Sequence, residues 1–161
     1  VVGVLGHTLK LFPVQSKFVQ DVSLLLGENG FQKGDDVIAL SYIPGLVYAI
    51  GGVSPGHPAF ISSHLNFLTL SPNKYTEIAL GFADIERLKK SFVIVNVEPA
   101  PVIALLQDRG LEFPDQYKHI DDIKYLGTYY SVFKPVGINE VPSCSTHLEN
   151  CIYCEDLHNV H

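Results

Sequence analysis

The most constraining feature of this sequence is a long segment without charge. From Val37 to Asn73 the chain carries no Asp, Glu, Lys or Arg. A stretch of that length could cross a membrane, but prolines and glycines divide it into pieces shorter than the ~20 apolar residues a span needs. We therefore expect the buried middle of a domain, with ligand-type loops between its elements. The dividing residues are Pro44, Gly45, Gly51, Gly52, Pro55, Gly56 and Pro58.

Length and charge limit the class of protein. A chain of 161 residues fits one domain and can bury a real core. Its net charge of −6 argues against nucleic acid as a partner, because phosphate binding needs clustered Lys and Arg. We divide the chain into an N-terminal lead segment (1–13), an α/β domain (14–137) and a tail rich in Cys and His (138–161).

Short apolar runs alternate with helical patterns through the middle of the chain. The run from Val37 to Tyr42 lacks alternation, and the run from Phe92 to Val97 is rich in β-branched residues, so both are expected to be buried strands. Helices are expected over 15–26, 46–50, 85–90 and 102–108, with a hairpin of strands 118–125 and 128–134. This order predicts an α/β fold, a three-layer Rossmann-like sandwich with a mostly parallel central sheet and a C-terminal antiparallel hairpin.

Polar side chains follow the two predicted buried strands. Ser41 and Tyr42 end the first strand, and Asn96 and Glu98 lie at the end of the second. Ligands of open α/β sheets bind beyond the carboxyl ends of the strands, so these four residues are the candidate ligand site. The alternative is that Tyr42 packs half-buried and that Asn96 satisfies a loop backbone.

No catalytic motif accompanies this candidate site. The chain contains no GxSxG, Walker, HExxH or GxGxxG pattern, and spacing suggests no base–nucleophile pair. The paired carboxylates Asp35–Asp36 and Asp121–Asp122 are expected on the solvated surface. The same holds for Arg87, Lys89 and Lys90, at the basic end of a helix that Asp84 caps.

The tail is the densest group of metal-ligand residue types. Cys151 and Cys154 have the local spacing of a zinc knuckle, and Cys144 and His147 could complete a tetrahedral site. A single CxxC is a weak signal. Two alternatives to a zinc site are a disulfide with one cysteine left over and a loosely held tail.

The order of motifs from about Val14 to Pro135 resembles a known family. The segments are GDDVIALSYIPGLVYAIGG, ADIERLKKSFVIVNVEPAP, VIALLQDRGLEF and GTYYSVFKP, after an N-terminal helix. They resemble the soluble C-terminal domain of bacterial membrane glycosyltransferases of the GT-C type, which use polyprenyl-phosphate sugars and are similar to dolichyl-phosphate-mannose protein mannosyltransferases. The Cys/His tail departs from this pattern.

The resemblance implies a role in acceptor or glycan binding, or in regulation, for a domain that is not catalytic on its own. It implies an extracytoplasmic location at a membrane, with the transmembrane part of the same protein and a glycan or lipid-linked sugar as partners. The family's acidic catalytic residues belong to that transmembrane part, so none is assigned here. Two alternatives remain open: a free-standing α/β small-molecule binding protein or enzyme, and an interaction module with a zinc-binding tail.

Overall fold

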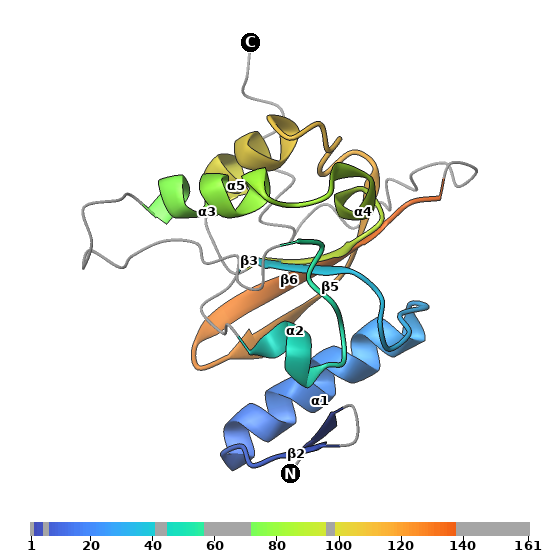
Figure 1. Cartoon of the computed structure of the whole chain (residues 1–161). Coiled ribbons are helices and arrows are strands. Elements are labelled where there is room, and N and C mark those ends of the chain that lie inside the picture. Colours follow the sequence, from blue (N-terminus) through green and yellow to red (C-terminus); the bar gives the residue numbers. More distant parts are fainter. Residues whose placement is uncertain (1, 5–6, 41–44, 57–71, 96–98, 138–161) are drawn as a thin grey trace.

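The computed structural model of this chain describes residues 2–4, 7–40, 45–56, 72–95 and 99–137 (Figure 1). Within them the chain is a mixed α/β structure with an open four-stranded sheet. The elements in order are β1 (Val2–Val4), β2 (His7–Leu9), α1 (Pro13–Glu28), β3 (Val37–Leu40), α2 (Leu46–Ala49), α3 (Pro72–Gly81), α4 (Ile85–Leu88), β4 (Phe92–Val95), α5 (Pro99–Gln107), β5 (Tyr117–Tyr125) and β6 (Thr128–Pro135).

The sheet has the strand order β3-β4-β6-β5 and combines two kinds of pairing. β3 and β4 are parallel, with Val37 opposite Phe92 and Leu40 opposite Val95. β6 pairs antiparallel with β4, and β5 pairs antiparallel with β6. The amino ends of β3 and β4 therefore share one end of the sheet, and the turn of the β5–β6 hairpin lies at the other end, beyond their carboxyl ends.

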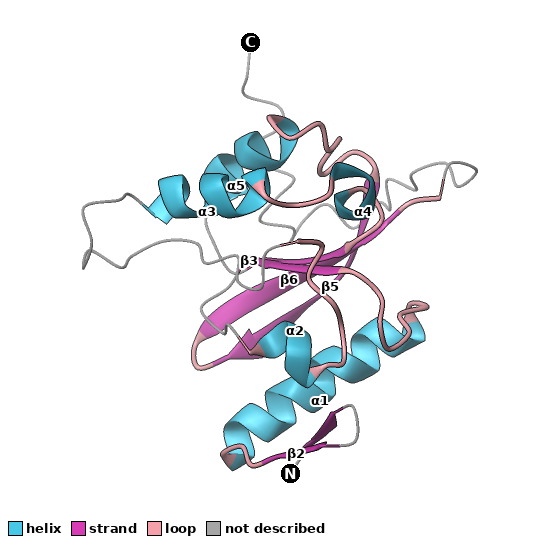
Figure 2. Ribbon diagram, viewed as in Figure 1, coloured by secondary structure: helices cyan, strands magenta, loops and turns pink. Residues whose placement is uncertain are grey.

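Helices lie on both faces of the sheet (Figures 1 and 2). β3 and β4 are buried on both faces, which explains their apolar sequence without alternation. One core cluster joins Ile38, Val93, Val95 and Phe133 to Leu80, Leu88 and Leu106 of α3, α4 and α5. The other joins Val37, Ala39, Ile94 and Val132 to Phe18, Val22, Leu26 and Leu46 of α1 and α2.

Local chemistry sets the ends of several elements. Pro13 opens α1, where its missing N–H costs nothing, and the Gln15 side chain accepts a hydrogen bond from Phe12 N at 3.2 Å. Asp84 caps α4 by accepting from the backbone N–H groups of Glu86 and Arg87. Leu126 and Gly127 connect β5 to β6 with φ values of 49° and 85°, as a type I′ hairpin turn requires.

The structure confirms the α/β class and most of the predicted elements. The helices expected near 15–26, 46–50, 85–90 and 102–108, the two buried strands and the C-terminal hairpin are all present. The expectation of a mostly parallel sheet is wrong for the described strands. β6 pairs antiparallel with β4 and with β5, so β3–β4 is the single parallel pair of strands in the described four-stranded sheet. The sequence also failed to predict α3 and the β1–β2 hairpin, which lies within the lead segment.

Candidate functional site

The predicted ligand site follows two strands that the structure places side by side. Leu40 and Val95 end the described parts of β3 and β4, and they are register partners in a parallel pair. The chain therefore reaches both halves of the candidate site from neighbouring positions at one end of the sheet. The candidate residues themselves, Ser41, Tyr42, Asn96 and Glu98, lie outside the described residues.

The β5–β6 hairpin extends past this end of the sheet. Ser131 is opposite Val95, so Tyr130 and Tyr129 continue β6 beyond the last described residue of β4. Tyr130 is buried, whereas the Tyr129 side chain is half exposed at 52%. Aromatic side chains thus reach the level of the candidate site from β6.

The helix that follows β4 has an unusual first turn. α5 begins at Pro99 and has a second proline, Pro101, in the same turn. Proline has no backbone N–H, so this turn presents fewer donors than the helix N-termini that usually bind phosphate. The local chemistry therefore disfavours a phosphate cradle of the nucleotide-binding kind at the start of α5.

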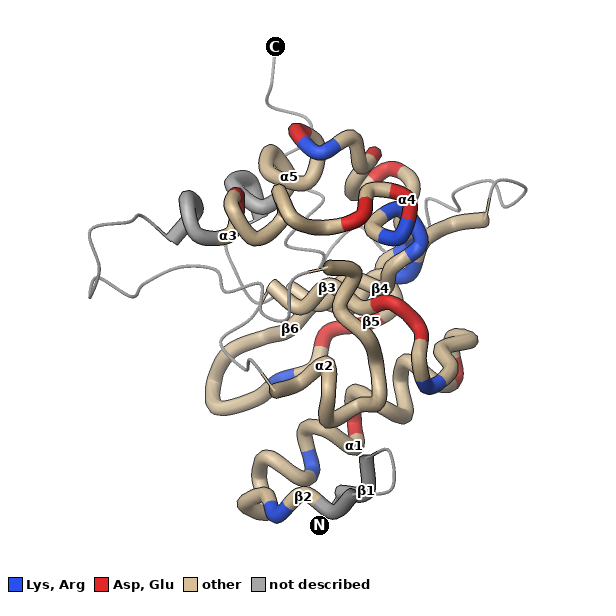
Figure 3. The backbone as a smooth tube through the Cα atoms, viewed as in Figure 1, with Lys and Arg blue, Asp and Glu red and all other residues tan. Residues whose placement is uncertain are grey.

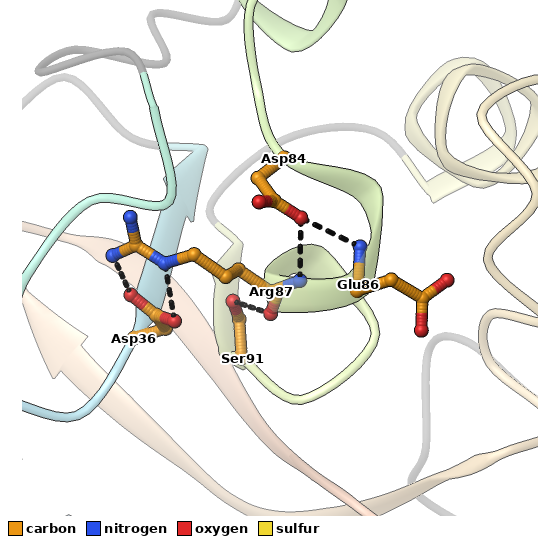
Figure 4. A network of polar contacts seen from close by, with 5 residues as sticks. All are labelled: Asp36, Asp84, Glu86, Arg87 and Ser91. Carbon is orange, nitrogen blue, oxygen red and sulfur yellow. Dashed lines mark hydrogen bonds and ion pairs between the residues drawn. The ribbon is translucent and has the colours of Figure 1, made fainter.

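The opposite, amino end of the sheet carries a polar network (Figure 4). Its Asp84 cap was expected from the sequence, but the pair of Arg87 with Asp36 was not. Arg87 Nε donates to Asp36 Oδ2 at 2.9 Å, and Arg87 Nη2 donates to Asp36 Oδ1. The hydrogen bond with Asp36 raises the pKa of the Arg87 guanidinium above its ordinary value, although partial burial opposes the shift. This bidentate pair ties α4 to the start of β3, across 51 positions of sequence.

The network corrects one expectation from the sequence. Asp36 and Arg87 were both expected as solvated charges, but the Asp36 side chain is only 18% exposed and the two groups pair. The other contacts of the network stabilise the two ends of α4. Asp84 caps its amino end, and Ser91 Oγ donates to Arg87 O at 2.8 Å near its carboxyl end. Every one of these polar groups has a partner within the network, so its evident role is structural.

β5 carries a histidine–carboxylate contact that also escaped prediction. His119 Nε2 lies 3.1 Å from Asp122 Oδ1, and both side chains are about half-buried. Residues three apart in a regular strand point to opposite faces, and the irregularity between His119 and Asp121 brings these two together. Asp121 is exposed as expected, whereas Asp122 is not fully solvated. The contact orients the imidazole on β5, which is an edge strand of the described sheet.

The candidate metal residues, Cys144, His147, Cys151 and Cys154, lie outside the described residues as well. Within the described ranges, no group of three or more His, Cys, Asp or Glu is arranged to hold a metal ion. The zinc site in the tail stays a prediction.

Comparisons with protein-family models, with curated proteins and with solved structures find no match to this chain. None of the helices within the described ranges combines the length and the apolar character that crossing a membrane requires. The resemblance stated from the sequence motifs therefore stays a prediction, and so does the ligand site.

Proposed function

We propose that this chain is a ligand-binding domain, and that its site lies beyond the carboxyl ends of β3 and β4. The observation that carries the proposal is the parallel pairing of Leu40 with Val95. It brings the chain to Ser41 and Tyr42 and to Asn96 and Glu98 from adjacent positions, at the end of the sheet where open α/β folds bind ligands.

The proposed ligand is rich in neutral hydroxyl groups, as a glycan is. A hydroxyl (Ser41), a phenol (Tyr42), an amide (Asn96) and a carboxylate (Glu98) donate and accept hydrogen bonds as sugar recognition requires. Aromatic rings such as Tyr129 offer an apolar face with a polar edge. The two prolines at the start of α5 support a neutral ligand over a nucleotide, because they remove phosphate-binding N–H groups.

We further propose that the domain belongs to a membrane glycosyltransferase that uses polyprenyl-phosphate sugars. Support comes from the order of elements: a strand, a short helix followed by Gly51 at positive φ, a helix before β4, and a closing strand, as the resemblance implies. In this proposal the domain lies on the extracytoplasmic side, beside the transmembrane part of the same protein. It contributes to acceptor or glycan binding, or to regulation, and performs no catalysis alone.

Finally, we propose a three-layer Rossmann-like sandwich as the complete architecture. The helices on both faces of the sheet and the parallel β3–β4 pair support it. An experimental structure with a further parallel strand beside β3 would agree with this proposal. An experimental structure that leaves β3–β4 as the single parallel pair would contradict it.

Binding measurements test the ligand class. We expect calorimetric titration of the purified chain to show binding of a short mannose oligosaccharide and no binding of a nucleoside diphosphate. Asn96→Ala should weaken sugar binding about fivefold, the equivalent of one lost hydrogen bond. Asp108→Asn, at the far end of α5, is the matched control and should leave the affinity unchanged.

Two outcomes would refute parts of this proposal. Sugar affinity that is unchanged by both Asn96→Ala and Tyr42→Ala would remove the site from the carboxyl end of the sheet. For the membrane context, we expect the gene upstream of Val1 to encode several apolar segments of ~20 residues. A start codon shortly before Val1 would instead make the chain a free-standing binding protein.

A further inference from the structure

Exposed apolar side chains lie at the turn of the β5–β6 hairpin and at the start of α1, the helix that packs on β5 through Phe18. Leu126 is 74% exposed and Tyr129 52% exposed, and at the start of α1 Phe12 is 76% exposed and Val14 53% exposed. We call these four residues the apolar tip. Their side chains belong to two segments that are far apart in the sequence.

Contacts within the core bring these two segments together. The ring of Phe18 in α1 stacks on Tyr125 of β5, with centroids 4.5 Å apart, next to the hairpin turn. Phe31, just after α1, contacts Phe92 at the amino end of β4. α1 therefore runs from the turn toward the amino end of the sheet, and Phe12 lies only ~9 Å along the helix axis from Phe18. In Figure 1 the first turn of α1 lies toward the same side of the molecule as the hairpin turn.

The backbone at Leu126 is strained. Its φ of 49° lies in the left-handed region, where Asn, Asp and Gly are favoured and a bulky apolar residue is an outlier. The side chain is exposed, so packing within this chain does not offset the strain. An apolar residue that is both strained and exposed points to a contact outside the chain.

The two segments that form the tip are basic, although the whole protein is acidic. Residues 1–20 and 123–137 contain no Asp or Glu, although the chain has a net charge of −6. Lys17 pairs with Asp21 at 2.7 Å, which leaves Lys10 and Lys124 as the cations nearest the tip. Lys124 Nζ lies 5.4 Å from the centre of the Tyr129 ring. Figure 3 shows basic positions just before α1 and within it.

We propose that the apolar tip inserts into the interfacial region of an anionic lipid bilayer. Leu126 and Phe12 supply apolar area, Tyr129 has the amphipathic ring that favours the headgroup level, and Lys10 and Lys124 attract anionic headgroups. The tip is built from a hairpin turn and a helix start. This proposal does not rest on the proposed glycan site, because it needs neither a sugar nor a transmembrane part.

Vesicle flotation with the purified chain tests the proposal. We expect binding to phosphatidylcholine vesicles that contain phosphatidylglycerol, and much weaker binding to phosphatidylcholine alone. Leu126→Asn should lower the partition coefficient on the order of tenfold, since it removes one buried Leu side chain from the interface. Lys124→Gln should lower binding about fivefold, and only with anionic vesicles.

Phe82→Asn is the matched control, because Phe82 is 73% exposed but lies just before α4, the helix that Arg87 ties to the amino end of the sheet. We expect it to leave vesicle binding unchanged. Leu126→Asn should melt at the same temperature as the original chain or higher, because Asn tolerates positive φ, so its loss of binding cannot come from unfolding.

Three results would overturn the proposal. The first is no binding of the original chain to either vesicle, and the second is an equal loss with Phe82→Asn and Leu126→Asn. The third is a dimer in sedimentation velocity that Leu126→Asn dissociates, because the tip would then be an interface between two copies of the chain. Sugar titration of Leu126→Asn separates this proposal from the glycan site, since its sugar affinity should not change.

Discussion

The two ends of the sheet differ in how far their side chains are buried and paired. At the amino end of β3 and β4, Arg87 clamps Asp36, and Phe113 is fully buried against Tyr117 and Phe133. At the carboxyl end, Leu126 and Tyr129 are exposed around strands that lead to polar residues. The difference indicates that the amino end holds the fold together, and the proposed ligand site lies at the opposite, carboxyl end.

The aromatic clusters show the same contrast. Phe113 meets Phe133 edge to face at 5.0 Å and Tyr117 at 5.2 Å, and all three are buried. At the other end Phe18 stacks on Tyr125, which is only half-buried. Substitutions at the two ends should therefore differ in their effect on stability.

The largest effect is expected from Phe113→Ala. Phe113 is 0% exposed, so its removal leaves a cavity in the core beneath α4 and α5. We expect a loss of about 3–5 kcal/mol in the free energy of unfolding. Urea denaturation followed by circular dichroism measures it, and a loss below about 1 kcal/mol would mean that the amino end is not the stable one.

A pH-dependent loss is expected from Tyr117. Burial raises the pKa of its phenol above the ordinary 10.0, and the phenol O–H donates to Leu88 O at 3.2 Å. Folding favours the neutral phenol. Its contribution to the free energy of unfolding is therefore complete below about pH 10, and above that pH it is lost at about 1.4 kcal/mol per pH unit. The difference in unfolding free energy between the original chain and Tyr117→Phe should fall from about pH 10 upward. A difference that stays constant to about pH 11 would contradict the burial of this phenol.

Asp84→Ala should cost about 1 kcal/mol, because the N–H groups of Glu86 and Arg87 lose their cap. The matched control is Asp108→Ala, since Asp108 is an exposed carboxylate after the end of α5. We expect the control to be neutral or slightly stabilising. Thermal melts compare the two variants, and equal melting temperatures would show that the cap contributes nothing.

The smallest effect is expected at the carboxyl end. Tyr129→Thr keeps a strand-forming residue and removes an exposed ring, so stability should change by less than about 0.5 kcal/mol. The same denaturation assay measures it beside Phe113→Ala. A loss comparable to that of Phe113→Ala would erase the contrast between the two ends.

Sequence patterns predicted the elements whose signals are local. β3 and β4 are continuous apolar runs, α4 has Asp84 as its cap, and the hairpin has Gly127 in its turn. α3 gave a weaker pattern, because its described core residues are Thr76, Ala79 and Leu80, which leave a narrow and partly polar buried face.

Non-local features could not be predicted in the same way. The insertion of β6 beside β4 depends on register between distant segments, and no local pattern encodes it. The pairing of Arg87 with Asp36 joins residues 51 positions apart, and the contact of His119 with Asp122 depends on a strand irregularity. For the candidate site, the rule about strand ends predicts a place beyond the parallel β3–β4 pair. Its four residues lie outside the described residues, so the site stays a prediction.

The most direct test of the central claim is a map of ligand contacts on the two ends of the sheet. The measurement is a titration of the ¹⁵N-labelled chain with a short mannose oligosaccharide, followed by amide chemical shifts. We predict that the shifts concentrate at Leu40, Val95 and Ser131, while Asp36, Arg87 and Phe92 stay unchanged. Shifts confined to the amino end, around Asp36 and Arg87, would contradict the account.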